Sequence, residues 1–191
     1  MEFSEVVRRR RMRRSYLPEP VPRDVLELVL DRATRHPSAG FAQGVSFTVI
    51  TKDETRRALA ELAGEPEYIA RGFEPWLTAA PAHVLLATSE EAYHQRYAEG
   101  DKGGSSRSWA VPYWHVDAGA ALMLLLLAAV DEGLAAGFLG AHRLTGVGNL
   151  LDLPADVTPV GLVTLGYPGN NERVSHSHAR GRQPVVHWES W

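Results

Sequence analysis

The 191-residue chain contains no cysteine, which excludes disulfide bonds, thiolate metal sites and cysteine nucleophiles. A chain of this kind suits a reducing compartment, so we expect it in the cytoplasm. Long apolar runs are also missing. The longest, residues 118–130, falls short of the roughly 20 residues that span a bilayer. This run predicts a buried core helix, and we expect no association with a membrane.

Only one short stretch of the chain is strongly basic. Six arginines occupy residues 8–14, "RRRRMRR", although the net charge of the whole chain is −3. The remainder therefore carries about −9, whereas a nucleic-acid-binding protein spreads positive charge over a face that meets many phosphates. We expect no nucleic-acid partner, and an adaptor that uses residues 8–14 alone is the alternative.

The balance of 45% hydrophobic and 23% charged residues is that of an ordinary globular protein. The chain shows no internal repeat and no linker, so we expect a single domain over residues 1–191. Asp53 and Asp117 are expected to cap helices, and residues 90–112 to form a surface loop or lid. Strands are expected at residues 45–51, 82–89 and 159–168, and a short strand or turn at 134–140. Helices are expected at 4–14, 23–35, 53–62, 68–80 and 117–131.

These elements predict an α+β fold with a mixed sheet flanked by helices. Helices and strands alternate only loosely, which argues against a regular doubly wound sheet. The helix at residues 117–131 is apolar nearly all round, so we expect it at the centre of the molecule, buried on several sides.

Two short basic turns lie near opposite ends of the chain. Arg13, Arg14 and Ser15 precede a proline-rich stretch, and Arg180 and Arg182 precede a proline near the C-terminus. Guanidinium groups bind phosphate oxygens in pairs, and a hydroxyl fills a further acceptor, so the two turns suit a phosphate monoester. A solvated basic end without a ligand explains the same residues equally well.

Two stretches rich in small residues suit a flat ligand. In "HPSAGFAQG", residues 36–44, the glycines allow close approach of the backbone, and Ser38 and Gln43 offer polar groups. In "GLAAGFLGAH", residues 133–142, small side chains leave room for a planar ring beside a backbone N–H at or near Gly140. A helix stop and close helix–strand packing are the alternative explanations.

Other catalytic signatures are weak or missing. His176 and His178 are two residues apart with no third metal ligand nearby in the sequence, so we expect no metal. We find no Ser/His/Asp order, no phosphate-binding P-loop and no dinucleotide glycine fingerprint.

In their order and spacing, the motifs resemble the FMN-dependent nitroreductase family over nearly the whole chain. The motifs are "RRS" at 13–15, "PSAGFAQG" at 37–44, "DAGAALMLLLLAAVDEGL" at 117–134, "LAAGFLG" at 134–140, "VTLGYP" at 163–168 and "RGRQP" at 180–184. The resemblance implies an intertwined α+β homodimer with FMN at the subunit interface. It also implies that NADH or NADPH reduces the flavin and leaves before a nitroarene, quinone or similar acceptor binds.

The resemblance also assigns residues to parts of the flavin, with no catalytic acid or base. The basic turns would hold the phosphate and ribityl chain, the loop at 37–39 would flank the isoalloxazine, and residues 138–140 would cover its other side. The implied cofactor-binding residues are Arg13, Arg14, Ser15, Leu17, Pro37, Ser38, Ala39, Gln43, Phe138, Leu139, Gly140, Arg180 and Arg182.

Three positions, in two of the motifs, depart from the pattern of that family. Leu17 stands where members often have a basic residue near the flavin N1 edge, and Phe41 and Gly44 stand where members have asparagine and proline. Loss of a cation near N1 lowers the reduction potential of a flavin. A flavin- or deazaflavin-binding module with little turnover is therefore the alternative to an enzyme.

Overall fold

The computed structural model describes residues 1–102, 106, 109–170 and 185–190. Its centre is a four-stranded sheet in the order β1-β2-β4-β3, and all three strand pairings are antiparallel. A parallel bridge from Met12 to Ala136 makes the sheet mixed at its β3 edge. The strands are β1 (Val45–Ile50), β2 (Ala82–Thr88), β3 (Ala135–Gly140) and β4 (Thr158–Gly166).

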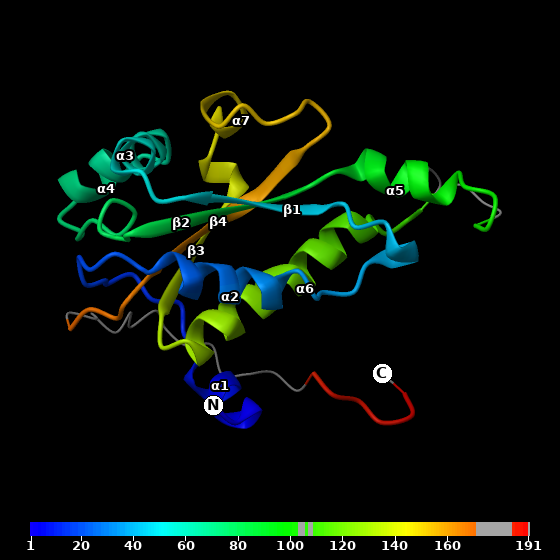
Figure 1. Ribbon diagram of the computed structural model, residues 1–191, viewed down its shortest axis with the longest axis horizontal. Helices are drawn as coiled ribbons and strands as arrows, with labels where there is room; N and C mark the ends of the chain where they lie inside the picture. Colours follow the sequence, from blue (N-terminus) through cyan, green and yellow to red (C-terminus); the bar gives the residue numbers. More distant parts are fainter. Residues whose placement is uncertain (103–105, 107–108, 171–184, 191) are drawn as a thin grey trace.

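Helices cover both faces of the sheet, so the predicted α+β fold is confirmed. Figure 1 shows α2 and α6 on one face and α3, α4 and α7 on the other. The helices are α1 (Phe3–Arg9), α2 (Arg23–Ala33), α3 (Asp53–Leu62), α4 (Glu65–Ala70), α5 (Glu90–Tyr97), α6 (Tyr113–Asp131) and α7 (Val147–Leu150), with short 3-10 turns η1 (Ala39–Phe41) and η3 (Ala141–Arg143).

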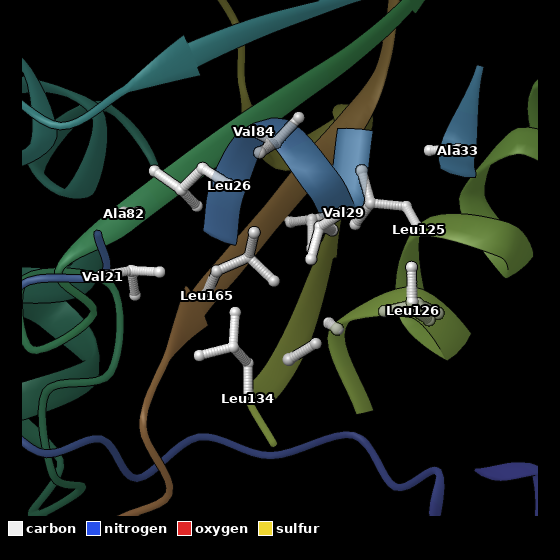
Figure 2. Close-up of a cluster of buried hydrophobic side chains, with 14 residues drawn as sticks. Val21, Leu26, Val29, Ala33, Ala82, Val84, Leu125, Leu126, Leu134 and Leu165 are labelled. Atoms are coloured by element: carbon white, nitrogen blue, oxygen red, sulfur yellow. The ribbon is translucent and has the colours of Figure 1, made fainter. Parts of the chain in front are cut away.

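The core lies in two layers, one on each face of the sheet. Neighbouring strand residues point to opposite faces, so Val84 packs toward α2 and α6 while Leu85 packs toward α3 and α7. Figure 2 shows Leu26 and Val29 of α2 beside Val84 in the first layer. Every residue of β2 is buried, as expected for a strand covered on both faces.

The central helix α6 is covered on one side only. It is the one helix among the described residues that is long and apolar enough to cross a membrane, and its buried side packs on α2 and the sheet. Its other side leaves Val116 and Met123 51% and 47% exposed. The expectation of burial on several sides is therefore wrong for a single chain.

The first helix is shorter than predicted. It ends at Arg9, and the next residues are extended because the Arg13 backbone N–H donates to the carbonyl oxygen of Ala136 on β3 (2.8 Å). Consecutive arginines would repel one another at helical spacing, whereas the open edge of the sheet offers the backbone a partner.

The predicted helix at 68–80 is also wrong. The helix there is α4, and the chain leaves it at Gly72, which has a left-handed φ of 82°. The buried Glu65 carboxylate then accepts backbone N–H groups of Trp76 (2.7 Å) and Leu77 (2.6 Å), which holds the next segment in a non-helical form. The predicted surface excursion at 90–112 begins as the helix α5.

Candidate functional site

The N-terminal segment at residues 12–17 lies along the edge of the sheet. Arg13 donates its backbone N–H to Ala136 on β3, and the Gly169 N–H donates to the Ser15 carbonyl oxygen (3.0 Å) beyond β4. Tyr16 forms an antiparallel bridge with the same stretch. The backbone of the predicted "RRS" turn is therefore held from two sides.

A glycine on β3 makes this close packing possible. A Cβ atom at Gly137 would lie 2.5 Å from the Arg13 carbonyl oxygen and 2.9 Å from the Tyr16 hydroxyl oxygen. The Tyr16 hydroxyl donates to that same carbonyl oxygen (2.7 Å) and also contacts the Thr164 hydroxyl (2.5 Å). Any larger residue at position 137 would displace the segment.

The two adjacent arginines point to opposite faces of the sheet edge. The Arg13 side chain lines a cavity together with Leu134, at the end of α6. The Arg14 guanidinium lies over the Trp76 ring, 4.9 Å from its centroid, on the face covered by α3 and α7. The structure therefore separates two side chains that the sequence predicted to act together, because successive residues of an extended chain alternate in direction.

The loop at residues 36–44 is anchored to the beginning of α6. Asp117 is 5% exposed, and one of its carboxylate oxygens accepts the Ala39 N–H (2.8 Å) and the Tyr93 hydroxyl (2.7 Å). Ser38 Oγ accepts the Gln43 N–H across the loop (2.8 Å). Burial and the hydrogen bond to Asp117 raise the pKa of Tyr93, which therefore stays a donor at neutral pH.

This contact corrects the expected role of Asp117. The residue lies inside α6, which begins at Tyr113, and it binds the loop instead of capping the helix. Asp53 likewise makes no cap hydrogen bond, since it is the first residue of α3 and pairs with Arg56 and Arg57.

The same loop has an unusual backbone. Gly40 and Phe41 both have φ of 62°, and Gln43 has φ of 54°. The left-handed conformation costs a non-glycine residue roughly 1 kcal/mol or more, so neighbouring contacts must hold it in place. Arg96 Nε donates to the Gly40 carbonyl oxygen (2.9 Å), and the Tyr97 ring leaves no room for a side chain at that glycine. Phe41 is 71% exposed and Pro37 is exposed.

The third predicted group is the end of β3. Phe138, Leu139 and Gly140 are half-buried there. Phe138 belongs to the packing on the α2 and α6 face, and Leu139 to the cluster on the other face that includes Trp76. Gly140 ends the strand and precedes η3.

Within one chain, the loop at residues 36–44 does not lie beside the N-terminal segment at residues 12–17. The loop binds Asp117 near the beginning of α6, whereas Val130 at the other end of that helix lines the same cavity as Arg13. At 1.5 Å per residue, these two positions of α6 are about 20 Å apart. Figure 1 shows the N-terminus beside the end of α6, where the Met1 ammonium group contacts Asp131 (2.5 Å).

Part of the predicted site lies outside the described residues. Arg180 and Arg182 belong to this part, as do His176 and His178. Among the residues that the structure describes, no group of three or more potential ligands could hold a metal ion.

Three functional candidates escaped the sequence patterns. Asp117 stands out as the one acid in an otherwise apolar stretch, but the local pattern predicts a helix cap there. Tyr93 and Trp76 carry no such signal, because their contacts join segments that are distant in the sequence.

Comparison with known proteins places the chain in a family. The nitroreductase family model matches residues 7–167, which include the N-terminal segment, the loop and β3. An FMN reductase (NAD(P)H) from Bacillus subtilis is 28% identical over 191 residues, covering 93% of this chain and 70% of the relative. An NADH dehydrogenase from Thermus thermophilus is 27% identical over 195 residues, covering 94% of this chain and 92% of the relative.

A solved structure agrees with these sequence matches. NfrA2 from B. megaterium has a TM-score of 0.77 and 25% identity, and the match covers 100% of this chain and 75% of that chain. The family match extends over most of the sequence, and the fold agrees from end to end. The chain belongs to the nitroreductase family.

Proposed function

We propose that the chain is an FMN-dependent oxidoreductase that takes hydride from NADH or NADPH and reduces an electron-poor acceptor, such as a nitroarene or a quinone, in a ping-pong reaction. The family supports an oxidoreductase, and the relatives named FMN reductase and NADH dehydrogenase support a nicotinamide donor. The observation that carries the proposal is the fixed position of Arg13 against β3, the strand that ends in Phe138–Gly140, and of Ser15 against the stretch after β4.

The groups on the N-terminal segment fit the polar end of FMN. Arg13 supplies a guanidinium and Ser15 a hydroxyl, both half-buried on a backbone held by β3 and the end of β4. We therefore assign the phosphate to Arg13 and the ribityl chain to Ser15. Arg180 and Arg182 are further phosphate ligands by similarity. Arg14 contacts Trp76 on the other face, so we assign it no phosphate contact.

The remaining residues would hold the ring system. We place residues 37–39 on one side of the isoalloxazine, with Gln43 at a polar edge, and residues 138–140 on the other side. When bound, FMN supplies the two-electron chemistry, and the chain binds it, orients it and excludes water. Leu17 offers no cation to the N1 edge, so we expect a low reduction potential.

A second copy of the chain would complete this site. One apolar stripe on α6 consists of the exposed Val116 and Met123 and the half-buried Ala120, Leu127 and Val130. Their spacing of four and three residues is typical of a helix that packs against another helix. We propose that this stripe is the centre of a homodimer interface.

The symmetry of such a dimer accounts for the two separated halves. A two-fold axis near Met123 would place the beginning of one α6 beside the end of the other. The loop at 37–43 of one copy would then lie beside the segment at 12–17 of the other, although within one chain they lie near opposite ends of α6. Each flavin would therefore contact both copies.

The arginine run does not form one basic surface. Arg8 and Arg9 pair with Glu5 on α1, and Arg14 lies over Trp76 on the far face of the sheet edge. We therefore propose small-molecule partners and no nucleic-acid partner. The absence of cysteine keeps the cytoplasm as our expected location.

A binding or sensing module for a flavin or deazaflavin is the second candidate. Leu17 and the exposed Phe41 favour it, because both stand at positions where the family pattern has other residues. Such a module would bind the cofactor but would react slowly with a nicotinamide nucleotide.

One experiment separates these functions. FMN is added to the purified protein, and the bound flavin is then titrated with NADH and NADPH without oxygen. An enzyme loses the visible absorbance of its oxidised flavin within seconds. Persistent absorbance with tightly bound FMN would support the module. Failure to take up FMN would contradict the enzyme and a flavin-binding module, and would leave only a module for a deazaflavin.

A further inference from the structure

We propose that Arg11 is an additional phosphate ligand, which acts beside Arg13 in the cavity between the N-terminal segment and the turn after α6. The inference rests on the proposed function for the identity of the ligand, a flavin phosphate monoester. It assigns a role to a residue that lies two positions before the "RRS" motif.

Three arginines line the cavity. It has a volume of about 150 Å³, and its lining consists of Arg9, Arg11 and Arg13 together with Met1, Val130, residues 133–136 and Pro168. A single water needs only about 10–15 Å³ of such space, so the cavity is large enough for a phosphate group. None of the described residues that line it carries a side-chain carboxylate.

The backbone directs Arg11 and Arg13 to the same side. The bridge between Met12 and Ala136 fixes an extended conformation, in which alternate residues share a side. Met12 lies between the two arginines and is 51% exposed. Arg11, Arg13 and Ser15 therefore lie on the same side of the extended segment, and Arg11 is about 7 Å along the segment from Arg13. This places Arg11 at the phosphate end of the proposed flavin.

The nearby acids are already paired with other cations. Glu5 binds Arg8 and Arg9, and these hydrogen bonds lower the pKa of Glu5 to about 2. Asp131 binds the Met1 ammonium group and Arg32.

Arg11 itself has no ion pair or side-chain hydrogen bond within the described part of the chain. Within that described part its guanidinium donors are not used, and it shares the cavity with Arg9 and Arg13. A dianionic phosphate accepts such donors and pairs with their positive charge.

A purely structural role makes a different prediction. Cations near the end of a helix stabilise its free carbonyl groups, and Arg11 lies near the end of α6. In that case Arg11→Ala would lower stability and would weaken every flavin equally. A phosphate contact instead weakens only flavins that carry the phosphate.

The test compares FMN with riboflavin, which lacks the phosphate. Affinities of both are measured by flavin fluorescence for the wild-type chain, Arg11→Ala, Arg11→Lys and the control Arg8→Ala. The control removes the same charge from a residue that does not line the cavity. We expect Arg11→Ala to weaken FMN about tenfold, which is the effect of one charge-assisted hydrogen bond, and to change riboflavin less than twofold. Arg11→Lys should recover part of the loss.

The outcomes are distinguishable. Equal FMN affinity of wild type and Arg11→Ala would overturn the inference and leave the proposed function in place. The inference would also be overturned if Arg11→Ala weakened the affinities for FMN and riboflavin equally. It would likewise be overturned if Arg8→Ala weakened the affinity for FMN as much as Arg11→Ala does. A wild-type chain that binds neither flavin would overturn the proposed function and the inference with it.

Discussion

The buried carboxylate of Asp117 gives the sharpest test of how the loop at 36–44 is held. Its oxygen accepts both the Ala39 N–H and the Tyr93 hydroxyl in a site closed to water. A hydrogen bond to a charged group contributes about 1.5–3 kcal/mol, and one between neutral groups about 0.5–1.5 kcal/mol. Asp117→Asn keeps the shape but removes the charge, so each of the two bonds loses about 1 kcal/mol.

We therefore expect Asp117→Asn to lower the free energy of unfolding by about 2 kcal/mol. For a chain of this size the midpoint of thermal unfolding should fall by about 4–8 °C. The assay is urea and thermal unfolding followed by circular dichroism at fixed protein concentration, because dimerisation couples stability to concentration. Asp152→Asn changes an exposed acid and serves as the control, with an expected change within about 0.5 kcal/mol.

A double-mutant cycle with Tyr93→Phe checks the mechanism. Both changes act on one hydrogen bond, so their combined cost should be smaller than the sum of the single costs. FMN affinity should fall in Asp117→Asn as well, because the loop loses its anchor. An unchanged unfolding midpoint in Asp117→Asn, or strictly additive costs, would refute the reasoning.

Three further predictions concern other parts of the molecule. Burial lowers the pKa of His83 from its ordinary 6.5 to about 4, so at pH 5 this histidine is protonated in the unfolded chain but not in the folded chain. The free energy of unfolding should therefore fall by about 2 kcal/mol between pH 7.5 and 5. His83→Gln should remove most of that loss, as measured by urea unfolding at both pH values. Gly137→Ala places a Cβ 2.5 Å from the Arg13 carbonyl oxygen and should weaken FMN at least tenfold in a fluorescence titration, whereas Gly148→Ala, with open space around it, should not. Met123→Glu should convert a dimer to monomers in sedimentation experiments and abolish FMN binding, whereas Leu28→Glu on α2 should do neither.

The sequence predicted the strands well because their signal is local. Runs of β-branched and apolar residues predicted β1, β2 and β4 within one or two residues of their observed limits, and the stretch "LAAGFLG" predicted a short strand or turn where β3 lies. The prediction of a helix at 68–80 was wrong because the buried carboxylate of Glu65, which precedes this stretch, binds the backbone of Trp76 and Leu77. The hydrophobic pattern of residues 68–80 does not indicate this contact.

The sequence predicted which motifs form the candidate site, but not how their side chains are arranged in space. The types of residue in "RRS" pointed to a phosphate, but the expected helix hid the extended backbone that turns Arg13 and Arg14 to opposite faces. The separation of the loop from this segment follows from the length of α6 and from the bond between Ala39 and Asp117. Neither feature can be read from a single stretch of sequence.

The central claim is that each flavin site combines the segment at 12–17 of one copy with the loop at 37–43 of another, and complementation between two damaged chains tests it most directly. Arg13→Ala damages one half-site, and Ser38→Ala, which removes the Gln43 contact, damages the other. The two variants are mixed, allowed to exchange subunits, and titrated with FMN at a concentration that fills intact sites only. The account predicts that the mixture regains about one quarter of the wild-type sites, since half of the dimers are mixed and each has one intact site. No gain over the separate variants, in a mixture shown to exchange subunits, would contradict it.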